Sequence, residues 1–369
     1  MKILATLVLA VGACSTVTPD DAVALSDLAA CDPTVPETCR YVSDLSFATV
    51  NTTDLLTLTD PLRPDLTSIP IRVHSPQDGS GVARPVVIWS HGGSPGPNSY
   101  TRAEEWGHVL AAAGYVVVHP GRLAVEVTGH EVECAAAGYD PSDPAKIESC
   151  RLFISNAVYG PQTAAFTARS LATIEAAVLA EFPGSVVFDS AKIIMAGHSA
   201  GTPAPLALAG ARRYFGTAQQ NDIDLHPVAF LATGPHGADY AQFNDGFNED
   251  SFNFIDSRPF LFISGRGDET GGIGQPQHEP SEGRTIGWLT STPGNKYLSW
   301  DNNTVAVHES MDYHKCDDSP LQRFHCDAFA MIGIAFLDAV VRVRPRAIAY
   351  LASSSYSALS GGQIELHRR

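Results

Sequence analysis

The sequence predicts an α/β fold, with a mostly parallel central sheet and helices on both faces, on three observations. Short apolar runs alternate with helical patterns along most of the 369 residues. Some runs are apolar throughout, as at residues 85–89, which is typical of strands buried on both faces of a parallel sheet. The 31 glycines and 25 prolines supply frequent turns between the runs.

The first half of the chain contains strand and helix patterns in the order that such a sheet requires. The expected elements are strands at 55–58 and 69–73, a buried strand at 85–89, a helix at 103–113 and a buried strand at 115–118. From Pro120 to about residue 160 the pattern is irregular. A loop of that length in a compact domain is usually functional.

The second half repeats strand and helix and ends in a long apolar helix. The expected elements are a helix at 162–182, a strand at 192–196, a helix at 203–212, strands at 227–232 and 259–264, a last strand from 297–300 with 305–307, and a helix at 324–341. A polar tail is expected from Ser353. Helices that connect successive parallel strands cover both faces of the sheet.

The domain organisation is simple. We expect a signal peptide at 1–14, a tether at 15–44 and one domain at 45–369 with loop insertions at 120–160 and 235–257. No internal repeat is visible, and no feature marks a second domain.

The amino terminus resembles an export signal. Lys2 precedes an apolar run at 3–11, which is too short to span a bilayer. The small residues before Cys14 resemble a bacterial lipoprotein signal, so Cys14 is the predicted lipidation site. We therefore expect an outer-membrane or cell-surface lipoprotein. Ordinary cleavage nearby, giving a periplasmic or secreted protein, is the alternative.

The six cysteines other than Cys14 form local pairs along the chain. Fifteen pairings are possible, but separations of 8, 16 and 10 residues favour nearest neighbours. The expected disulfides are Cys31–Cys39, Cys134–Cys150 and Cys316–Cys326. No CxxC spacing occurs, so we expect no metal; a site formed by His314, Cys316, His325 and Cys326 is the weaker alternative.

The charge of the chain argues against nucleic acid as a partner. Lysine and arginine total 24 against 40 acidic residues, a formal charge of −16, whereas nucleic-acid binding needs a basic face. A content of 44% hydrophobic and 17% charged residues indicates a folded domain. We expect contact with a membrane only through an N-terminal lipid.

A serine follows the strand at 192–196 in a pattern typical of a nucleophile. Residues 197–201 read Gly-His-Ser-Ala-Gly and lead into a helical pattern. A tight turn here would project the Ser199 hydroxyl, and glycines would avoid collisions with neighbouring strands. The start of a helix also favours a developing oxyanion. Alone, the pattern also fits a glycine turn in a nucleotide-binding sheet.

Two further motifs support a nucleophilic serine. Residues 90–93, Ser-His-Gly-Gly, follow the strand at 85–89, where a second oxyanion-hole N–H is expected. Residues 265–268, Gly-Arg-Gly-Asp, follow the strand at 259–264. With 197–201, these motifs resemble the α/β-hydrolase superfamily. The narrower resemblance is to secreted bacterial serine esterases of the dienelactone-hydrolase-like, platelet-activating-factor-acetylhydrolase-like and polyester-hydrolase-like kinds.

The resemblance covers roughly residues 55 to 345 and implies the α/β-hydrolase fold. It also implies that the backbone N–H groups of Gly93 and Ala200 form the oxyanion hole. The long cysteine-bearing loop and the surroundings of the histidine depart from the family pattern.

A nucleophilic serine needs an imidazole, which in turn needs a carboxylate to orient it. Asp268 is the predicted acid, because it lies just past the carboxyl end of a strand; Glu269 and Asp239 are alternatives. His308 follows 304–307 directly and is the predicted base, with His314 as the alternative.

Other histidines have expected structural roles. His325 adjoins Cys326 at the start of the last helix, where we expect it to cap or pack. His198 is expected to be structural, and His91 to pack or form a hydrogen bond within the oxyanion loop.

The expected reaction is hydrolysis of a carboxylic ester through an acyl-enzyme. Ser199 attacks the carbonyl, His308 takes and returns the proton, Asp268 orients His308, and Gly93 and Ala200 hold the oxyanion. No cofactor is required. The alternatives are a peptidase or amidase with the same triad, and a catalytically silent hydrolase-fold lipoprotein that binds a ligand.

The insertion at 235–257 suggests the character of the substrate. It interleaves Tyr240, Phe243, Phe247, Phe252 and Phe254 with Asp239, Asp245, Glu249, Asp250 and Asp256. An apolar wall with an acidic rim would disfavour polyanionic substrates. Together with the charge of −16, this predicts a neutral or cationic ester as substrate, either a small molecule or a lipid. Alternatively, the aromatic rings pack the loop against the domain.

Overall fold

The computed structural model describes residues 31–60, 68–122, 125–140, 142–215, 218–238, 245–268, 283–313 and 316–369. Cys14 and the predicted signal peptide lie outside this part of the chain, as do Asp239, Glu269 and His314.

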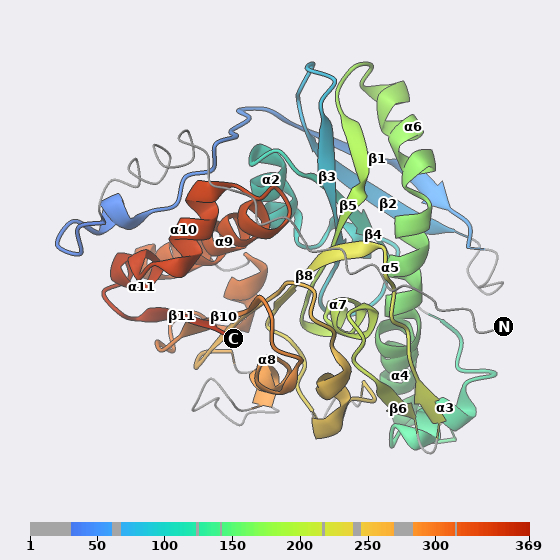
Figure 1. Cartoon of the computed structure of the whole chain (residues 1–369). Coiled ribbons are helices and arrows are strands. Elements are labelled where there is room, and N and C mark those ends of the chain that lie inside the picture. Colours follow the sequence, from blue (N-terminus) through green and yellow to red (C-terminus); the bar gives the residue numbers. More distant parts are fainter. Residues whose placement is uncertain are drawn as a thin grey trace, which may run out of the picture.

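A mixed sheet runs through the centre of the molecule (Figure 1). Among the described residues it has nine strands in the order β1-β2-β4-β3-β5-β8-β9-β10-β11. These are β1 (Val50–Leu58), β2 (Ile69–Pro76), β3 (Ala83–Ser90), β4 (Val116–Pro120), β5 (Val187–His198), β8 (Pro227–Thr233), β9 (Phe260–Gly265), β10 (Lys296–Asp301) and β11 (Ile364–Arg368). The strands from β4 to β10 pair in parallel, and β1, β2 and β11 pair antiparallel. The prediction of a mostly parallel sheet is confirmed. A separate hairpin joins β6 (Arg213–Phe215) to β7 (Ala218–Gln220).

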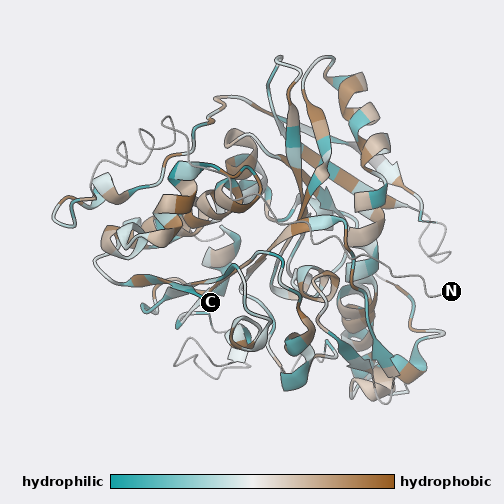
Figure 2. Cartoon of the chain, in the orientation of Figure 1, coloured by the Kyte–Doolittle hydropathy of each residue, from teal (hydrophilic) through white to brown (hydrophobic). Residues whose placement is uncertain are grey.

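Helices cover both faces of this sheet, as expected (Figure 1). One face carries α2 (Glu104–Ala112), α9 (Pro320–Val340) and α10 (Pro345–Ala352), and the other carries α5 (Tyr159–Arg169), α6 (Leu171–Glu181) and α7 (Pro203–Leu208). Strand β3 separates the two cores: Val86 and Ile88 pack on one side, and Val87 and Trp89 on the other. Apolar residues are accordingly concentrated along the central strands (Figure 2). This burial on both faces explains why the strand is apolar throughout.

The segment from 120 to 160 is more regular than the sequence suggests. It contains α3 (Glu131–Ala136), α4 (Pro144–Phe153) and a short π-helix, η3 (Ile154–Val158). The Asp143 side chain accepts a hydrogen bond from Ala145 N–H and caps α4. The prediction of an irregular loop is therefore wrong, because short helices with local caps carry little periodic pattern.

Three other expectations differ from the structure. The helix expected at 162–182 is two helices that meet at Ser170, whose Oγ donates to the Phe166 carbonyl. Residues 305–307 form no strand and lead into a 3₁₀ helix, η7 (His308–Asp312). The expected polar tail instead contains α11 (Ser355–Leu359) and β11, which pairs with β10 and buries Ile364. In β11 only Ile364 is buried, so this edge strand leaves no alternating apolar pattern in the sequence from which it could be predicted.

All three predicted disulfides are present: Cys31–Cys39, Cys134–Cys150 and Cys316–Cys326. The second joins α3 to α4, and the third leaves no thiolate for the alternative metal site. Disulfides of this kind are typical of proteins that fold in an oxidising compartment. In the described residues, no helix is both long and apolar enough to cross a membrane.

The end of the predicted tether packs against the domain. Cys39 and Tyr41 are buried, and Tyr41 Oη donates to Asp338 Oδ2 on α9 at 2.8 Å. Ser43 Oγ donates to the same oxygen at 2.7 Å. The chain is therefore fixed to the domain from about Cys39 onward.

Candidate functional site

The Ser199 turn joins β5 to α7 in a tight conformation. Ser199 has φ +49°, a left-handed backbone that non-glycine residues seldom adopt. A Cβ on Gly197 would lie 2.6 Å from the Gly201 carbonyl oxygen, and one on Gly201 would collide with the Ser90 carbonyl at the end of β3. The two glycines therefore allow the turn to pack against the neighbouring strand.

The structure brings Asp268 and His308 together. Asp268 follows β9, His308 begins η7 after β10, and His308 Nδ1 lies 2.5 Å from Asp268 Oδ1. Ser264 Oγ donates to the other carboxylate oxygen at 2.6 Å. Both members of the pair are buried. The carboxylate thus places the His308 proton on Nδ1 and leaves Nε2 unprotonated.

The His308 ring lies beside the Ser199 turn. Its centroid is 4.7 Å from that of His198, the residue before Ser199. A Cβ on Gly234, just after β8, would lie 2.8 Å from His308 Cε1, so this glycine makes room for the ring. Within the described residues, the buried Nε2 atom forms no hydrogen bond. The ring nitrogen that would serve as base is therefore available near the turn.

Burial and charge set the protonation states of this pair. Burial would raise the pKa of Asp268, but Arg284, His308 and Ser264 outweigh it and hold that pKa below its ordinary value. Burial lowers the pKa of His308 to about 4, although Asp268 opposes the shift. At neutral pH the pair is therefore a carboxylate and a neutral imidazole, the states that a general base requires.

A second histidine joins the His308 segment to the Ser199 turn. His198 Nε2 lies 3.2 Å from the His308 carbonyl oxygen, and Nδ1 lies 3.3 Å from Asp312 Oδ2, at the end of η7. Burial would lower the pKa of His198, but Asp312 and then Asp268 raise it above its ordinary value. Both ring nitrogens of His198 thus face groups of η7, which places η7 beside the turn.

The loop after β3 has the backbone expected of an oxyanion hole. Gly93 has φ +69°, and among the described residues its N–H donates no hydrogen bond. The carbonyl of the preceding residue, Gly92, accepts from Arg102 Nη1 at 3.1 Å and lies 2.8 Å from His91 Nδ1. On the Ser199 turn, the Ser199 carbonyl accepts from Thr202 N–H at 2.8 Å and Thr202 Oγ at 2.7 Å.

Three arginines around this site, Arg102, Arg122 and Arg284, were not identified from the sequence. Arg122, two residues after β4, is buried and donates to the Ala200 carbonyl at 2.7 Å and to the His91 carbonyl. Arg284 donates to the carbonyls of Asp268 and Gly234. Burial and then the Arg102 charge, opposed by Asp245, lower the pKa of Arg122 to about 9.

His325 has the packing role that was one of its two expected roles. It lies in α9, and its Nδ1 atom is 2.6 Å from Asp301 Oδ2, with both side chains fully buried. It does not cap the helix, because Ser319 does so. The expectation of a hydrogen bond within the oxyanion loop is confirmed for His91.

The described part of the 235–257 insertion packs against the domain. Phe247 and Phe252 are buried in the core, with ring centroids 5.2 Å apart. Phe254 is partly exposed, and the Arg212 guanidinium lies 3.4 Å above its ring. Asp245 is buried beside His236. These aromatic rings therefore pack the loop against the domain, as the alternative prediction stated. The described residues named here form no apolar wall with an acidic rim.

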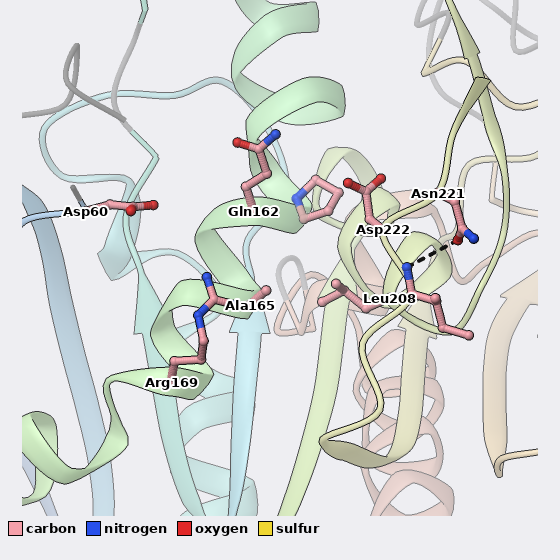
Figure 3. A pocket seen from close by; sticks show the side chains of 9 residues that line it. Asp60, Gln162, Ala165, Arg169, Leu208, Asn221 and Asp222 are labelled. Atoms are coloured by element: carbon pink, nitrogen blue, oxygen red, sulfur yellow. Dashed lines mark hydrogen bonds between the residues drawn. The ribbon is translucent and has the colours of Figure 1, made fainter. Parts of the chain in front are cut away.

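A separate pocket of about 210 Å³ lies away from these residues (Figure 3). It is lined by Asp60, Pro161, Gln162, Ala165, Arg169, Leu208, Asn221, Asp222 and Ile223. Leu208 is the last residue of α7, so the pocket lies at the opposite end of that helix from Ser199. It contains none of the predicted site residues.

No protein-family model matches the chain, and no curated protein matches it. The described residues contain no group of three or more histidine, cysteine, aspartate or glutamate side chains that could hold a metal ion.

Proposed function

We propose that this protein is a serine hydrolase that cleaves carboxylic esters through a Ser199–His308–Asp268 triad. The observation that carries the proposal is the buried hydrogen bond between Asp268 and His308, beside a serine held at positive φ. A carboxylate that fixes one imidazole nitrogen leaves the other to take the serine proton. The mostly parallel sheet, with these residues after β5, β9 and β10, is compatible with an α/β hydrolase.

In this mechanism Ser199 Oγ attacks the ester carbonyl while His308 Nε2 takes its proton. The Gly93 and Ala200 N–H groups hold the oxyanion, and His308 then protonates the departing alcohol. Water, activated by the same imidazole, releases the acid from the acyl-enzyme. We propose a neutral small-molecule or lipid ester as substrate, and export with lipid attachment at Cys14.

Activity-based labelling tests this function. Wild-type protein should react with a fluorophosphonate probe and hydrolyse p-nitrophenyl esters of graded chain length. Ser199→Ala should abolish labelling, and Ser199→Ala and His308→Ala should each lower kcat by at least about 10³-fold. Ser170→Ala, a serine substitution at the junction of α5 and α6, is the matched control and should retain activity.

The alternatives predict other results. A wild type that neither labels nor hydrolyses any ester would rule out the enzyme. If His314→Ala alone were inactive, His314 would be the base. Hydrolysis of anilides at rates similar to those of esters would indicate an amidase.

A further inference from the structure

We infer that Arg102 is a positioning residue of the oxyanion hole, which it orients and polarises through the Gly92 carbonyl. The inference rests on the proposed function, and it assigns a role to a side chain outside the triad. The Gly93 N–H and the Gly92 carbonyl belong to the same peptide, so a donor on the carbonyl affects the N–H at its other end.

Arg102 binds on both sides of Gly93. Its Nη1 atom donates to the Gly92 carbonyl at 3.1 Å and to the Ser94 carbonyl at 2.8 Å. A Cβ on Gly93 would collide with this same atom. Gly93 is therefore required for the approach of the guanidinium as well as for its positive φ.

A hydrogen bond from a cation to a peptide carbonyl has two effects here. It fixes the plane of the peptide, so that the Gly93 N–H keeps one direction while a substrate binds and reacts. It also polarises the peptide, because chains of hydrogen bonds strengthen one another in a low-dielectric site. Both effects stabilise a negative oxygen more than a neutral carbonyl, so they favour the transition state over the bound ester.

The surrounding charges preserve this polarisation. Among the described residues, neither Arg102 nor Arg122 forms an ion pair, although the whole chain has a charge of −16. Both guanidinium groups instead donate to carbonyls of the oxyanion loop or the Ser199 turn. An ion pair would neutralise much of the field that each cation exerts on these peptides.

His91 lies against both Arg122 and the Gly92 carbonyl. Arg122 approaches both ring nitrogens, with Nε 3.3 Å from His91 Nε2 and Nη2 3.1 Å from His91 Nδ1. The Nδ1 atom also lies 2.8 Å from the Gly92 carbonyl oxygen. Burial and the Arg122 charge hold the pKa of His91 well below its ordinary value, so the ring is neutral. Arg102 is therefore the charged donor to the Gly92 carbonyl.

Substitution of Arg102 separates these effects from a general loss of structure. Arg102→Gln removes the charge from a partly exposed side chain, and Arg102→Lys restores it. With p-nitrophenyl acetate we expect Arg102→Gln to lower kcat about tenfold with KM within twofold of wild type. The kcat of Arg102→Lys should be at least threefold higher than that of Arg102→Gln. Affinity for a trifluoromethyl ketone, which forms a tetrahedral oxyanion on serine, should fall in parallel with kcat.

Arg258→Gln is the matched control, because Arg258 also donates to backbone carbonyls, those of Asp224, Pro227 and Leu208. It should leave kcat within twofold of wild type even where it lowers the melting temperature. Three results would each overturn the inference: kcat of Arg102→Gln within twofold of wild type, a loss confined to KM, or equal losses in Arg102→Lys and Arg102→Gln. An inactive, unlabelled wild type would instead overturn the proposed function, and the inference with it.

Discussion

Buried histidines occur in two regions of this molecule, and their surroundings differ. At the carboxyl edge of the sheet, four of them lie beside aspartates: His198 with Asp312, His236 with Asp245, His308 with Asp268 and His325 with Asp301. Beneath α2, His74 and His119 lie on adjacent strands, and among the described residues neither forms an ion pair. A carboxylate orients an imidazole and stabilises its cation, whereas burial alone keeps the ring neutral.

The four paired histidines also differ among themselves. His308 and His325 have nearly equal distances to their carboxylates, 2.5 and 2.6 Å. Of these two, His308 is close to the Ser199 turn, through its contact with His198, whereas His325 lies within α9. A buried histidine–aspartate pair is therefore not by itself evidence of catalysis, and its position relative to a nucleophile is decisive.

The largest expected effect separates these two pairs. Asp268→Asn should lower kcat/KM about 10³-fold, because an amide stabilises the wrong imidazole tautomer and does not stabilise the imidazolium. Asp301→Asn should leave kcat/KM within about fivefold but lower the free energy of unfolding by about 3 kcal/mol, since it disrupts a fully buried pair. Ester hydrolysis and urea denaturation measure the two quantities.

The exposed Asp317→Asn is the control for stability and should change it by less than about 0.5 kcal/mol. If Asp301→Asn were as inactive as Asp268→Asn, the distinction between a catalytic pair and a structural pair would fail.

Chain order was enough to propose three of the site residues. Ser199, Asp268 and His308 each follow a strand of the parallel sheet, and such strand ends meet at one edge. Arg102 and Arg122 could not be predicted in the same way. Their hydrogen bonds depend on which carbonyl groups two separate loops present to them, and no local sequence pattern encodes the contact between these loops.

The net charge of the chain also could not be used to predict the site. The net charge of −16 is a property of the whole chain, yet the charged side chains that donate to the loop after β3 are the cations Arg102 and Arg122. The acidic rim expected from the 235–257 insertion does not form in its described part, where Asp245 is buried beside His236. The total charge of a chain therefore does not predict the electrostatic field at one site.

The two histidines beneath α2, His74 and His119, should make the free energy of unfolding depend on pH. Burial, then the nearby His108 and Arg72 charges, lowers the pKa of His74 to about 3, and burial holds the pKa of His119 well below its ordinary value. Both rings are neutral when folded but bind a proton when unfolded below about pH 6.5, so stability must fall as the pH decreases. Each should contribute about 2 kcal/mol of loss between pH 7.5 and pH 5.

His119→Leu tests this prediction, because it removes one titrating ring with no hydrogen-bond partner among the described residues. Urea denaturation at pH 7.5 and pH 5 should show a difference about 2 kcal/mol smaller than in wild type. Val117→Ala, on the same face of β4, should instead lower stability equally at both pH values. An unchanged pH dependence in His119→Leu would show that this histidine is protonated in the folded protein.

The smallest expected effect concerns how the paired histidines influence one another. His198 and Arg284 both lower the pKa of His308, against the Asp268 charge that raises it. Since Asp312 keeps His198 charged, His198→Gln should remove a positive charge whose ring centroid is 4.7 Å away. The acid limb of kcat/KM, which reports protonation of His308 in the free enzyme, should then move up by about one pH unit from its wild-type position.

The pH profile separates this electrostatic role from a purely structural one. A loosened η7 would lower kcat/KM at every pH without moving the limb, whereas loss of the His198 charge moves the limb itself. His226→Gln, at an exposed histidine beside Asp224, is the control and should leave the profile unchanged. A limb that stays in place in His198→Gln would mean that His198 carries no charge when His308 titrates, so Asp312 would serve only to orient it.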